Sequence, residues 1–201
     1  MRLYGSPASP FVRKVRVVLH ETGLADRVAF VLASGTALDP GTMPLALNPL
    51  GKVPCLERPD GPALYDSRVV CRYLDDLAGS GLYPGKPRLW ETLTLEATGD
   101  GIAEAALAIV YEARLRPEAH RRAEIVAAQW GKIARSLDVL EARWMACLAG
   151  PFDAGQVAIA TALGYLDFRL GERDWRAGRP ALAAWAARTA ERPSVASTLP
   201  A

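Results

Sequence analysis

Residues 2–23 read RLYGSPASPFVRKVRVVLHETG, and this stretch predicts the first two elements of the fold. The apolar run at 2–4 predicts a short β-strand. Ser9 followed by Pro10 predicts the start of a helix, because serine is a favoured N-cap and proline suits the first helical position. Apolar residues then recur at helical spacing, and Gly23 predicts the end of the helix. The basic residues of this helix are expected to face solvent: Arg13, Lys14 and Arg16.

The remainder of the first half predicts three more strands and a second helix. Strands are expected at 28–32, 53–57 and 63–65, with a turn at 58–61. The segment 34–51 is expected to be a loop with at most one helical turn. Asp66 and Ser67 predict the start of the second helix, which continues to Leu77. The resulting order, strand–helix–strand and then strand–strand–helix, is the thioredoxin-like arrangement.

The two halves of this 201-residue chain differ in composition. Residues 1–100 hold 9 alanines and 10 prolines, whereas residues 101–201 hold 26 and 5. Alanine favours helices and proline disfavours them, so we expect helices at 88–115, 117–148, 154–171 and 180–191. Residues 79–87 read GSGLYPGKP, a linker composition. We therefore predict an α+β domain at 1–78, a linker at 79–87 and an all-α domain at 88–201.

Charge and cysteine content exclude several classes of function. There are 24 basic and 22 acidic residues, so the net charge of +2 gives no broad surface for nucleic acid or an acidic membrane. No apolar run approaches the roughly 20 residues that span a bilayer. Three scattered cysteines and two histidines predict neither a disulfide framework nor a metal site. The N-terminus lacks a signal-peptide pattern, so a cytoplasmic location is expected.

Three motifs carry a specific resemblance. They are SPFVRK at 9–14, NPLGKVPCL at 48–56 and YDSRVV at 65–70. In the helical half, DAGQVAIA at 153–160 and ALGYLDFR at 162–169 extend it over essentially the whole chain. Together they resemble a cytosolic-type glutathione S-transferase, especially bacterial members with a Ser-Pro-Phe helix start. The resemblance implies a homodimeric enzyme without a metal, in which the thiolate of the co-substrate glutathione attacks a small hydrophobic electrophile.

Ser9 has two readings. As an N-cap, its hydroxyl accepts a hydrogen bond from a free backbone N–H of the first turn. The resemblance places the family's catalytic serine or cysteine at the same position, where a hydroxyl and the positive helix end would stabilise a thiolate. Ser6 is the alternative. Serine cannot form a mixed disulfide with glutathione, so it favours activation of the glutathione thiolate over a glutaredoxin-like reaction.

The resemblance assigns two further segments to glutathione. A cis bond between Val53 and Pro54 would leave the Val53 backbone free to pair with the cysteinyl unit, although proline is also acceptable at the start of a strand. Lys52 is either a solvated lysine or a partner for the glycyl carboxylate. Ser67 would bind the γ-glutamyl carboxylate and Asp66 its ammonium group, although both residues also suit an ordinary helix N-terminus.

Two acidic positions in the helical half are further candidates for the site. Asp100 is either a surface carboxylate or, as in many relatives, a residue that reaches the glutathione of the neighbouring subunit. Glu104, one turn later, is a weaker candidate. Asp153 and Gln156 are expected to form a reciprocal capping box, in which losing the Asp153 cap would cost on the order of 1 kcal/mol.

Aromatic residues are candidates for either core or electrophile site. Those considered are Tyr111, Tyr165, Phe168 and Trp175. Phe11, Tyr111 and Arg114 are proposed to line the electrophile site. Cys55 and Cys71 lie on apolar faces and are expected to be inert core thiols.

Two rival functions remain open. One is a non-catalytic protein of the same fold that binds a partner. Such relatives often lose the residues that correspond to Pro54, Asp66 and Ser67, which are present here. The other is a glutathione-dependent isomerase or dehalogenase, which the sequence does not separate from a conjugating transferase.

Overall fold

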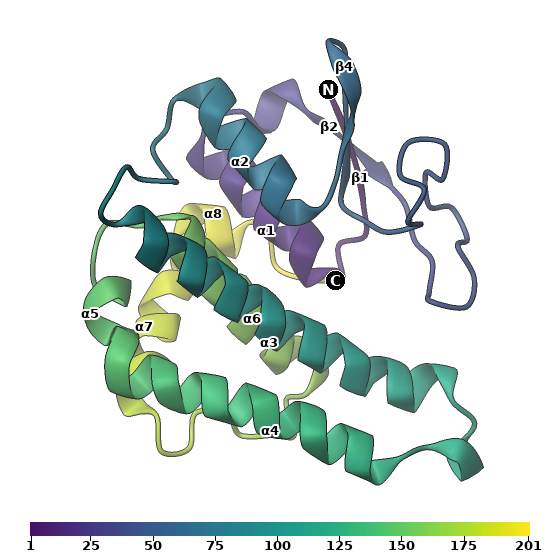
Figure 1. Ribbon diagram of the computed structural model, residues 1–201, viewed down its shortest axis with the longest axis vertical. Coiled ribbons are helices and arrows are strands. Elements are labelled where there is room, and N and C mark those ends of the chain that lie inside the picture. Colours follow the sequence, from purple (N-terminus) through teal and green to yellow (C-terminus); the bar gives the residue numbers. More distant parts are fainter.

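The computed structural model describes all 201 residues, and it divides into a small sheet with two helices and a larger helical bundle (Figure 1). The first part contains β1 (Arg2–Gly5), α1 (Pro10–Glu21), η1 (Ala25–Arg27), β2 (Ala29–Leu32), β3 (Cys55–Arg58), β4 (Gly61–Leu64) and α2 (Ser67–Ala78). The second contains α3 (Leu89–Leu115), η2 (Glu118–His120), α4 (Ala123–Val139), the π-helical turn η3 (Leu140–Trp144), α5 (Met145–Leu148), α6 (Ala154–Arg169), α7 (Pro180–Ala190) and α8 (Pro193–Ala196).

The four strands form one mixed sheet in the order β2-β1-β3-β4. Strand β1 runs parallel to β2, with Leu3 opposite Phe30, and antiparallel to β3, with Leu3 opposite Leu56. Strands β3 and β4 are antiparallel. This sheet, with α1 and α2 against one face (Figure 1), confirms the predicted thioredoxin-like arrangement.

Each part has a hydrophobic core, but residues from the second half of the chain also contribute to the core of the first part. Ala154, Val157 and Val195 belong to the same buried cluster as residues of β1, α1, β3 and α2. The second cluster joins α3, α4, α6 and α7 around the buried side chains of Trp175 and Trp185. Helix α2 ends at Ala78 and α3 begins at Leu89, so the proposed linker at 79–87 lies between them. The domain limits remain our proposal.

Most predicted elements are present, and their differences from the prediction are local. Strand β3 begins at Cys55, not at residue 53, and β4 covers 61–64, not 63–65. The helix expected from 117 begins at 123 because residues 118–120 form a separate short turn, while α6 ends at 169 and α7 at 190. The short helix α8 was not predicted, and 34–51 contains turns but no helix.

The predicted exposure of α1 is wrong for two of its three basic residues. Arg13 and Lys14 are 4% and 1% exposed, and only Arg16 is half-buried. The error arises because α1 is covered on more than one side: it packs against α2, α6, α8 and α3. A helix enclosed in this way has little solvent-facing surface, so its charged side chains must find partners inside the molecule.

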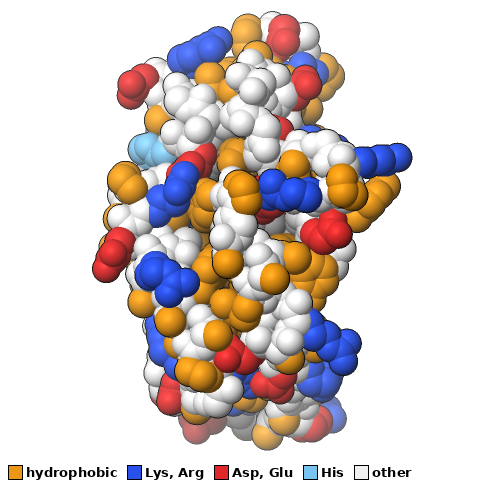
Figure 2. All heavy atoms as spheres, turned by 90° about the vertical axis from the view of Figure 1, so that its left-hand side faces the viewer, with side chains coloured by type: hydrophobic (Ala, Val, Ile, Leu, Met, Phe, Trp, Pro, Cys, Tyr) orange, Lys and Arg blue, Asp and Glu red, His pale blue; other side chains and the backbone are white.

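The surface shows no field of a single charge on the face drawn in Figure 2, where acidic and basic side chains alternate among hydrophobic ones. None of the helices combines the length and the apolar character that crossing a bilayer requires. No group of three or more His, Cys, Asp or Glu side chains is arranged to hold a metal ion.

Candidate functional site

Three of the predicted site segments meet at one edge of the sheet. Tyr4, near the end of β1, pairs with Cys55 at the start of β3, and Leu64 at the end of β4 pairs with Leu56. The loop after β1, the loop before β3 and the turn after β4 therefore leave the sheet on the same side. This register brings Ser9, Val53 and Ser67 to a common edge.

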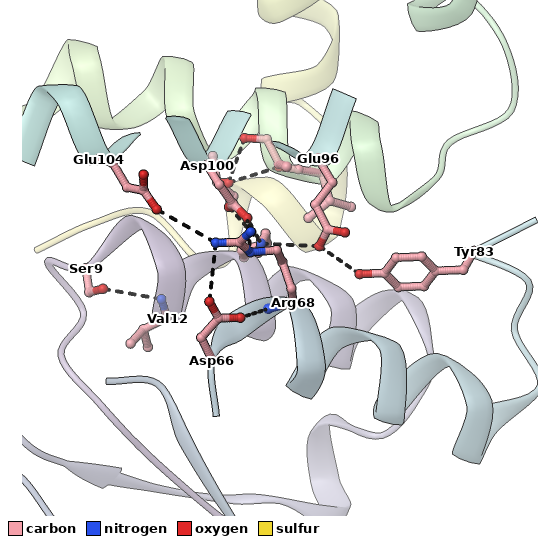
Figure 3. Close-up of polar contacts among 12 residues, drawn as sticks. Ser9, Val12, Asp66, Arg68, Tyr83, Glu96, Asp100 and Glu104 are labelled. Atoms are coloured by element: carbon pink, nitrogen blue, oxygen red, sulfur yellow. Dashed lines mark hydrogen bonds and ion pairs between the residues drawn. The ribbon is translucent and has the colours of Figure 1, made fainter. Parts of the chain in front are cut away.

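Ser9 forms the predicted N-cap of α1. Its backbone is extended (φ −84°, ψ 126°) and its Oγ accepts a hydrogen bond from the Val12 N–H at 3.4 Å (Figure 3). The Ser9 hydroxyl donates no hydrogen bond within the chain. Its proton is therefore free for a ligand while the oxygen caps the helix. Ser6 lies close by, since its carbonyl accepts a hydrogen bond from the Ser9 N–H.

The Val53–Pro54 peptide bond is cis, as the family resemblance implies. Neither the N–H nor the C=O of Val53 makes a hydrogen bond within the chain, although the residue is half-buried. Asn48, which the sequence analysis missed, shapes this loop: its Nδ2 donates to the Lys52 carbonyl and its Oδ1 accepts from the Leu50 N–H. Its place in the NPLGK turn was the available signal, because asparagine commonly bonds to nearby backbone in turns. Lys52 itself is exposed and forms no ion pair.

Asp66 and Ser67 begin α2 as predicted. Asp66 is the N-cap, and its Oδ1 accepts a hydrogen bond from the Arg68 N–H at 2.9 Å. Ser67 is 3% exposed, and its hydroxyl has no hydrogen-bond partner in the chain. As the first residue of the helix, its N–H also has no acceptor within the helix. This end of α2 therefore presents donors suited to an anion.

Arg68 connects α2 to α3, and the sequence analysis did not single it out. Its guanidinium lies 3.4 Å from Asp66, 3.3 Å from Asp100 and 3.8 Å from Glu104 (Figure 3). Asp66 and Arg68 are both about half exposed, so the cluster opens toward solvent. Its position directly after the Asp66-Ser67 cap was the only signal in the sequence. Glu104 is exposed, whereas Asp100 is not.

Asp100 is a buried residue, so its reading as a surface carboxylate is wrong. It is 4% exposed, and both of its oxygens accept hydrogen bonds from Lys14 Nζ, at 2.7 and 2.8 Å. Lys14 Nζ also lies 3.3 Å from Glu96, which accepts a hydrogen bond from the Tyr83 hydroxyl. Lys14 thus joins α1 to α3 through buried charges.

The ionisation of this buried cluster follows from its contacts. Burial disfavours the charge of Lys14, but the carboxylates of Asp100 and Glu96 outweigh it and raise the pKa of Lys14. Burial raises the pKa of Glu96, against the opposing effects of Lys14 and Tyr83. Burial likewise raises the pKa of Tyr83, so this phenol stays protonated.

The residues proposed for the electrophile site lie on α1 and α3 and differ in exposure. Phe11, one position after the start of α1, packs against the helical core, and Tyr111 is half-buried on α3. Arg114 is exposed and makes no ion pair or hydrogen bond. Tyr165 and Trp175 are buried core residues, and the Trp175 Nε1 donates to Asp167.

The thiols of Cys55 and Cys71 are buried and poorly ionised. Burial raises the pKa of Cys55 to about 11, and it raises that of the fully buried Cys71 further. Both cysteines are unpaired. The prediction that they are core thiols is confirmed, and at neutral pH neither supplies a nucleophile.

The capping box predicted for α6 is only half present. Asp153 Oδ1 accepts a hydrogen bond from the Gln156 N–H, as expected. The Gln156 Nε2, however, donates to the carbonyls of Cys147, Gly150 and Pro151, and the Gln156 Oε1 accepts no hydrogen bond from the Asp153 N–H. The tight turn before α6 brings these carbonyls within reach. This cap therefore shapes the fold and lies apart from the Ser9–Val53–Ser67 edge.

Comparison with known proteins decides the family. Residues 8–77 match the family described as glutathione S-transferase, N-terminal domain, and residues 123–188 match glutathione S-transferase, C-terminal domain. The chain belongs to the glutathione S-transferase family. Its resemblance to that family, and the two-part fold expected from it, are thereby confirmed.

Some relatives align with essentially the whole of this chain. It is 34% identical to the "Uncharacterized GST-like protein YibF" of Escherichia coli K12, over 100% of this chain and 98% of that protein. A glutathione transferase family member of Pseudomonas fluorescens Pf-5, solved with bound glutathione, is 43% identical over 100% and 98% of the chains, with a TM-score of 0.96. A glutathione S-transferase of Methylobacterium radiotolerans, in complex with glutathione sulfonate, is 34% identical over 99% and 94%, with a TM-score of 0.83.

Proposed function

We propose that this protein is a glutathione transferase that activates the glutathione thiolate for attack on a small hydrophobic electrophile. The observation that carries the proposal is the set of unsatisfied groups at one edge of the sheet: the Val53 N–H and C=O, and the Ser67 hydroxyl at the start of α2. Polar groups that have no hydrogen-bond partner in the chain are available to a ligand. The solved relative of P. fluorescens holds glutathione on a closely similar fold.

Each end of glutathione has a suitable partner at this edge. The Val53 backbone would pair with the cysteinyl unit as an added strand does. Ser67 would bind the γ-glutamyl carboxylate at the positive end of α2, and Asp66 would pair with its ammonium group. Lys52, which is exposed and unpaired, would reach the glycyl carboxylate.

Ser9 would stabilise the thiolate. A free thiol has a pKa near 8.5, so only a few per cent of it is ionised at neutral pH. The Ser9 proton is free to donate to the sulfur, and the N-terminus of α1 adds a positive partial charge. Each unit by which the thiol pKa falls corresponds to about 1.4 kcal/mol of thiolate stabilisation. Phe11, Tyr111 and Arg114 would form the wall that receives the electrophile.

Asp100 would act in this enzyme through Arg68. Both of its oxygens already bond to Lys14, and Arg68 lies between it and Asp66. Its proposed contact with the glutathione of a neighbouring subunit therefore adds a partner to a residue already bonded inside the chain. A cytoplasmic homodimer remains our proposal for the assembly.

Calorimetric titration with glutathione tests the proposal. We expect saturable binding to the unaltered chain and binding weaker by tenfold or more in Ser67→Ala, because hydrogen bonds to charged groups contribute about 1.5–3 kcal/mol. Ser197→Ala is the matched control, since Ser197 is exposed and its hydroxyl makes no hydrogen bond. Absence of binding at millimolar glutathione would rule out the enzyme and favour the non-catalytic partner-binding protein.

Product analysis separates the remaining alternatives. With a model aryl halide, a conjugating transferase yields a stable thioether that mass spectrometry detects. An isomerase or a dehalogenase returns glutathione either unchanged or as its disulfide. We expect the thioether, since Ser9 provides a hydroxyl and no thiol for exchange.

A further inference from the structure

A cavity of about 400 Å³ lies between α1, α6, α7 and the C-terminal segment. Eight of the thirteen residues that line it are hydrophobic, among them Leu163, Phe168 and Leu199. Its volume falls in the range of about 300–1,000 Å³ typical of ligand pockets. None of Ser9, Phe11, Tyr111 or Arg114 lines it, so it differs from the electrophile site proposed above.

Arg13 provides the charged group of this cavity. Its side chain is 4% exposed, and its one hydrogen bond runs from Nη2 to the Val195 carbonyl at 3.2 Å. Its Nε and Nη1 are buried without any hydrogen-bond partner. Gly164 makes room for the guanidinium, because a Cβ at that position would collide with Nη1. Arg13, Gly164 and Val195 all line the cavity.

No carboxylate of the chain neutralises Arg13. The acidic side chain in the lining is Asp167, and its two oxygens are already bound by Arg176, at 2.6 and 2.8 Å, and by Trp175 Nε1. Burial and the nearby Arg16 lower the pKa of Arg13, against a weaker opposing effect of Asp167. A buried guanidinium with free donors among apolar walls calls for an anion that brings its own apolar surface.

We propose that this cavity binds a small amphipathic anion, whose carboxylate pairs with the Arg13 guanidinium while its apolar part packs on Leu163, Phe168 and Leu199. A guanidinium suits a carboxylate because it stays positively charged and offers several N–H donors. The site shares helix α1 with Ser9, whose carbonyl accepts the hydrogen bond from the Arg13 N–H.

Calorimetric titration of the full-length protein with three eight-carbon probes tests this. We expect octanoate to bind saturably and at least tenfold more tightly than octan-1-ol, and octylammonium not to bind. Octanoate binding should persist when S-hexylglutathione is present at saturation. Equal binding of octanoate and octan-1-ol, or displacement of octanoate by S-hexylglutathione, would overturn the proposal.

Two variants localise the site. Arg13→Met should weaken octanoate binding at least tenfold and leave octan-1-ol unaffected. Ala190→Trp, at an exposed position of the cavity lining on α7, should block octanoate even if Arg13→Met fails to fold. Ala184→Trp is the control, because Ala184 is exposed on the same helix and lies outside the lining. Unchanged octanoate affinity in Ala190→Trp would show that the anion binds elsewhere.

Discussion

At the residue scale, the side chains that cap helices also occupy the positions that suit glutathione. Ser9 caps α1 with its oxygen and keeps its proton free, and Asp66 caps α2 beside the unpaired Ser67 hydroxyl. The two roles are compatible because a hydroxyl accepts and donates through different atoms. A helix end in this protein thus serves the fold and the proposed chemistry at once.

Ser9→Ala tests the thiolate role. We expect the pKa of the bound glutathione thiol to rise by about one unit, and kcat/KM at neutral pH to fall roughly tenfold, because less thiolate is present. The affinity for glutathione should stay within a few-fold. Measuring kcat/KM with an aryl halide across pH reports the thiol pKa directly.

Ser6→Ala is the matched control for Ser9, since both serines lie in the β1–α1 loop. If Ser6→Ala lost activity and Ser9→Ala kept it, the assignment would move to Ser6. Ser9→Ala also removes a helix cap, at a cost of about 1 kcal/mol. Both variants should therefore be assayed well below their melting temperatures.

At the element scale, glycines set how closely α3 and α6 approach each other. A Cβ on Gly99 would lie 2.5 Å from the carbonyl carbon of Ala158, and one on Gly155 would lie 2.6 Å from the Thr92 carbonyl oxygen. These two helices form the most extensive contact in the helical half (Figure 1). Their separation therefore depends on two positions that lack a side chain.

Gly99→Ala should destabilise the protein by about 2 kcal/mol, because overpacking forces α3 away from α6. Gly101→Ala is the control, since a Cβ at Gly101 meets no atom within 4 Å. This change should raise stability by up to about 1 kcal/mol through helix propensity. Chemical denaturation measures both, and equal effects of the two changes would contradict the close-packing argument.

A surface cluster connects the end of α1 to α8, and its contribution to the free energy of unfolding depends on pH. Burial opposes ionisation of Glu21, but hydrogen bonds from Arg192 and Ser194 and the Arg192 charge outweigh it and lower the pKa of Glu21 below 4.5. A carboxyl whose pKa is lower in the folded state contributes stability above its unfolded pKa. That contribution is lost as the pH falls through the folded value.

Glu21→Gln should therefore lower the free energy of unfolding by about 1 kcal/mol at pH 7. The difference in this free energy between the variant and the unaltered chain should shrink as the pH falls below about 4.5. Urea denaturation at a series of pH values measures this. Glu191→Gln is the control, because Glu191 is exposed and forms no ion pair. A difference that stayed constant down to pH 3 would show that Glu21 acts through packing and not through its charge.

At the scale of the whole molecule, the two halves are joined by buried charges as well as by apolar contacts. Lys14 on α1 meets Asp100 and Glu96 on α3, and Ala154, Val157 and Val195 complete the core beneath the sheet. Burying charge is costly unless partners are present, so the helical half stabilises a lysine that the first half alone would expose. Unfolding of one half should therefore destabilise the other.

Lys14→Met should lower the free energy of unfolding by about 3–5 kcal/mol, because it leaves the buried Glu96 without its cation and Asp100 with Arg68 alone. Arg16→Met is the control on the same helix, and it removes only a cation–π contact with Phe30, worth about 1 kcal/mol or less. Denaturation followed by circular dichroism measures both. Similar losses for the two variants would mean that the buried cluster does not couple the halves.

Much of the fold could be predicted from short segments of the sequence. The caps at Ser9, Asp66 and Asp153, the turn before β4 and the alanine content of the second half act within a few residues of themselves. The motifs around Val53 and Ser67 were likewise continuous in sequence, so the edge they form was predictable. Strand limits near Pro54 shifted because pairing with β1 decides where β3 begins.

The sequence by itself determined the order of elements, the family and the segments of the candidate site. Only the tertiary structure decided which charges are buried. The local sequence pattern predicts that Lys14 faces solvent, yet Lys14 bonds to Asp100, 86 residues away in the sequence. The burial of Arg13 and Asp100 is equally invisible to a local pattern. Burial depends on what packs against a residue from elsewhere in the chain.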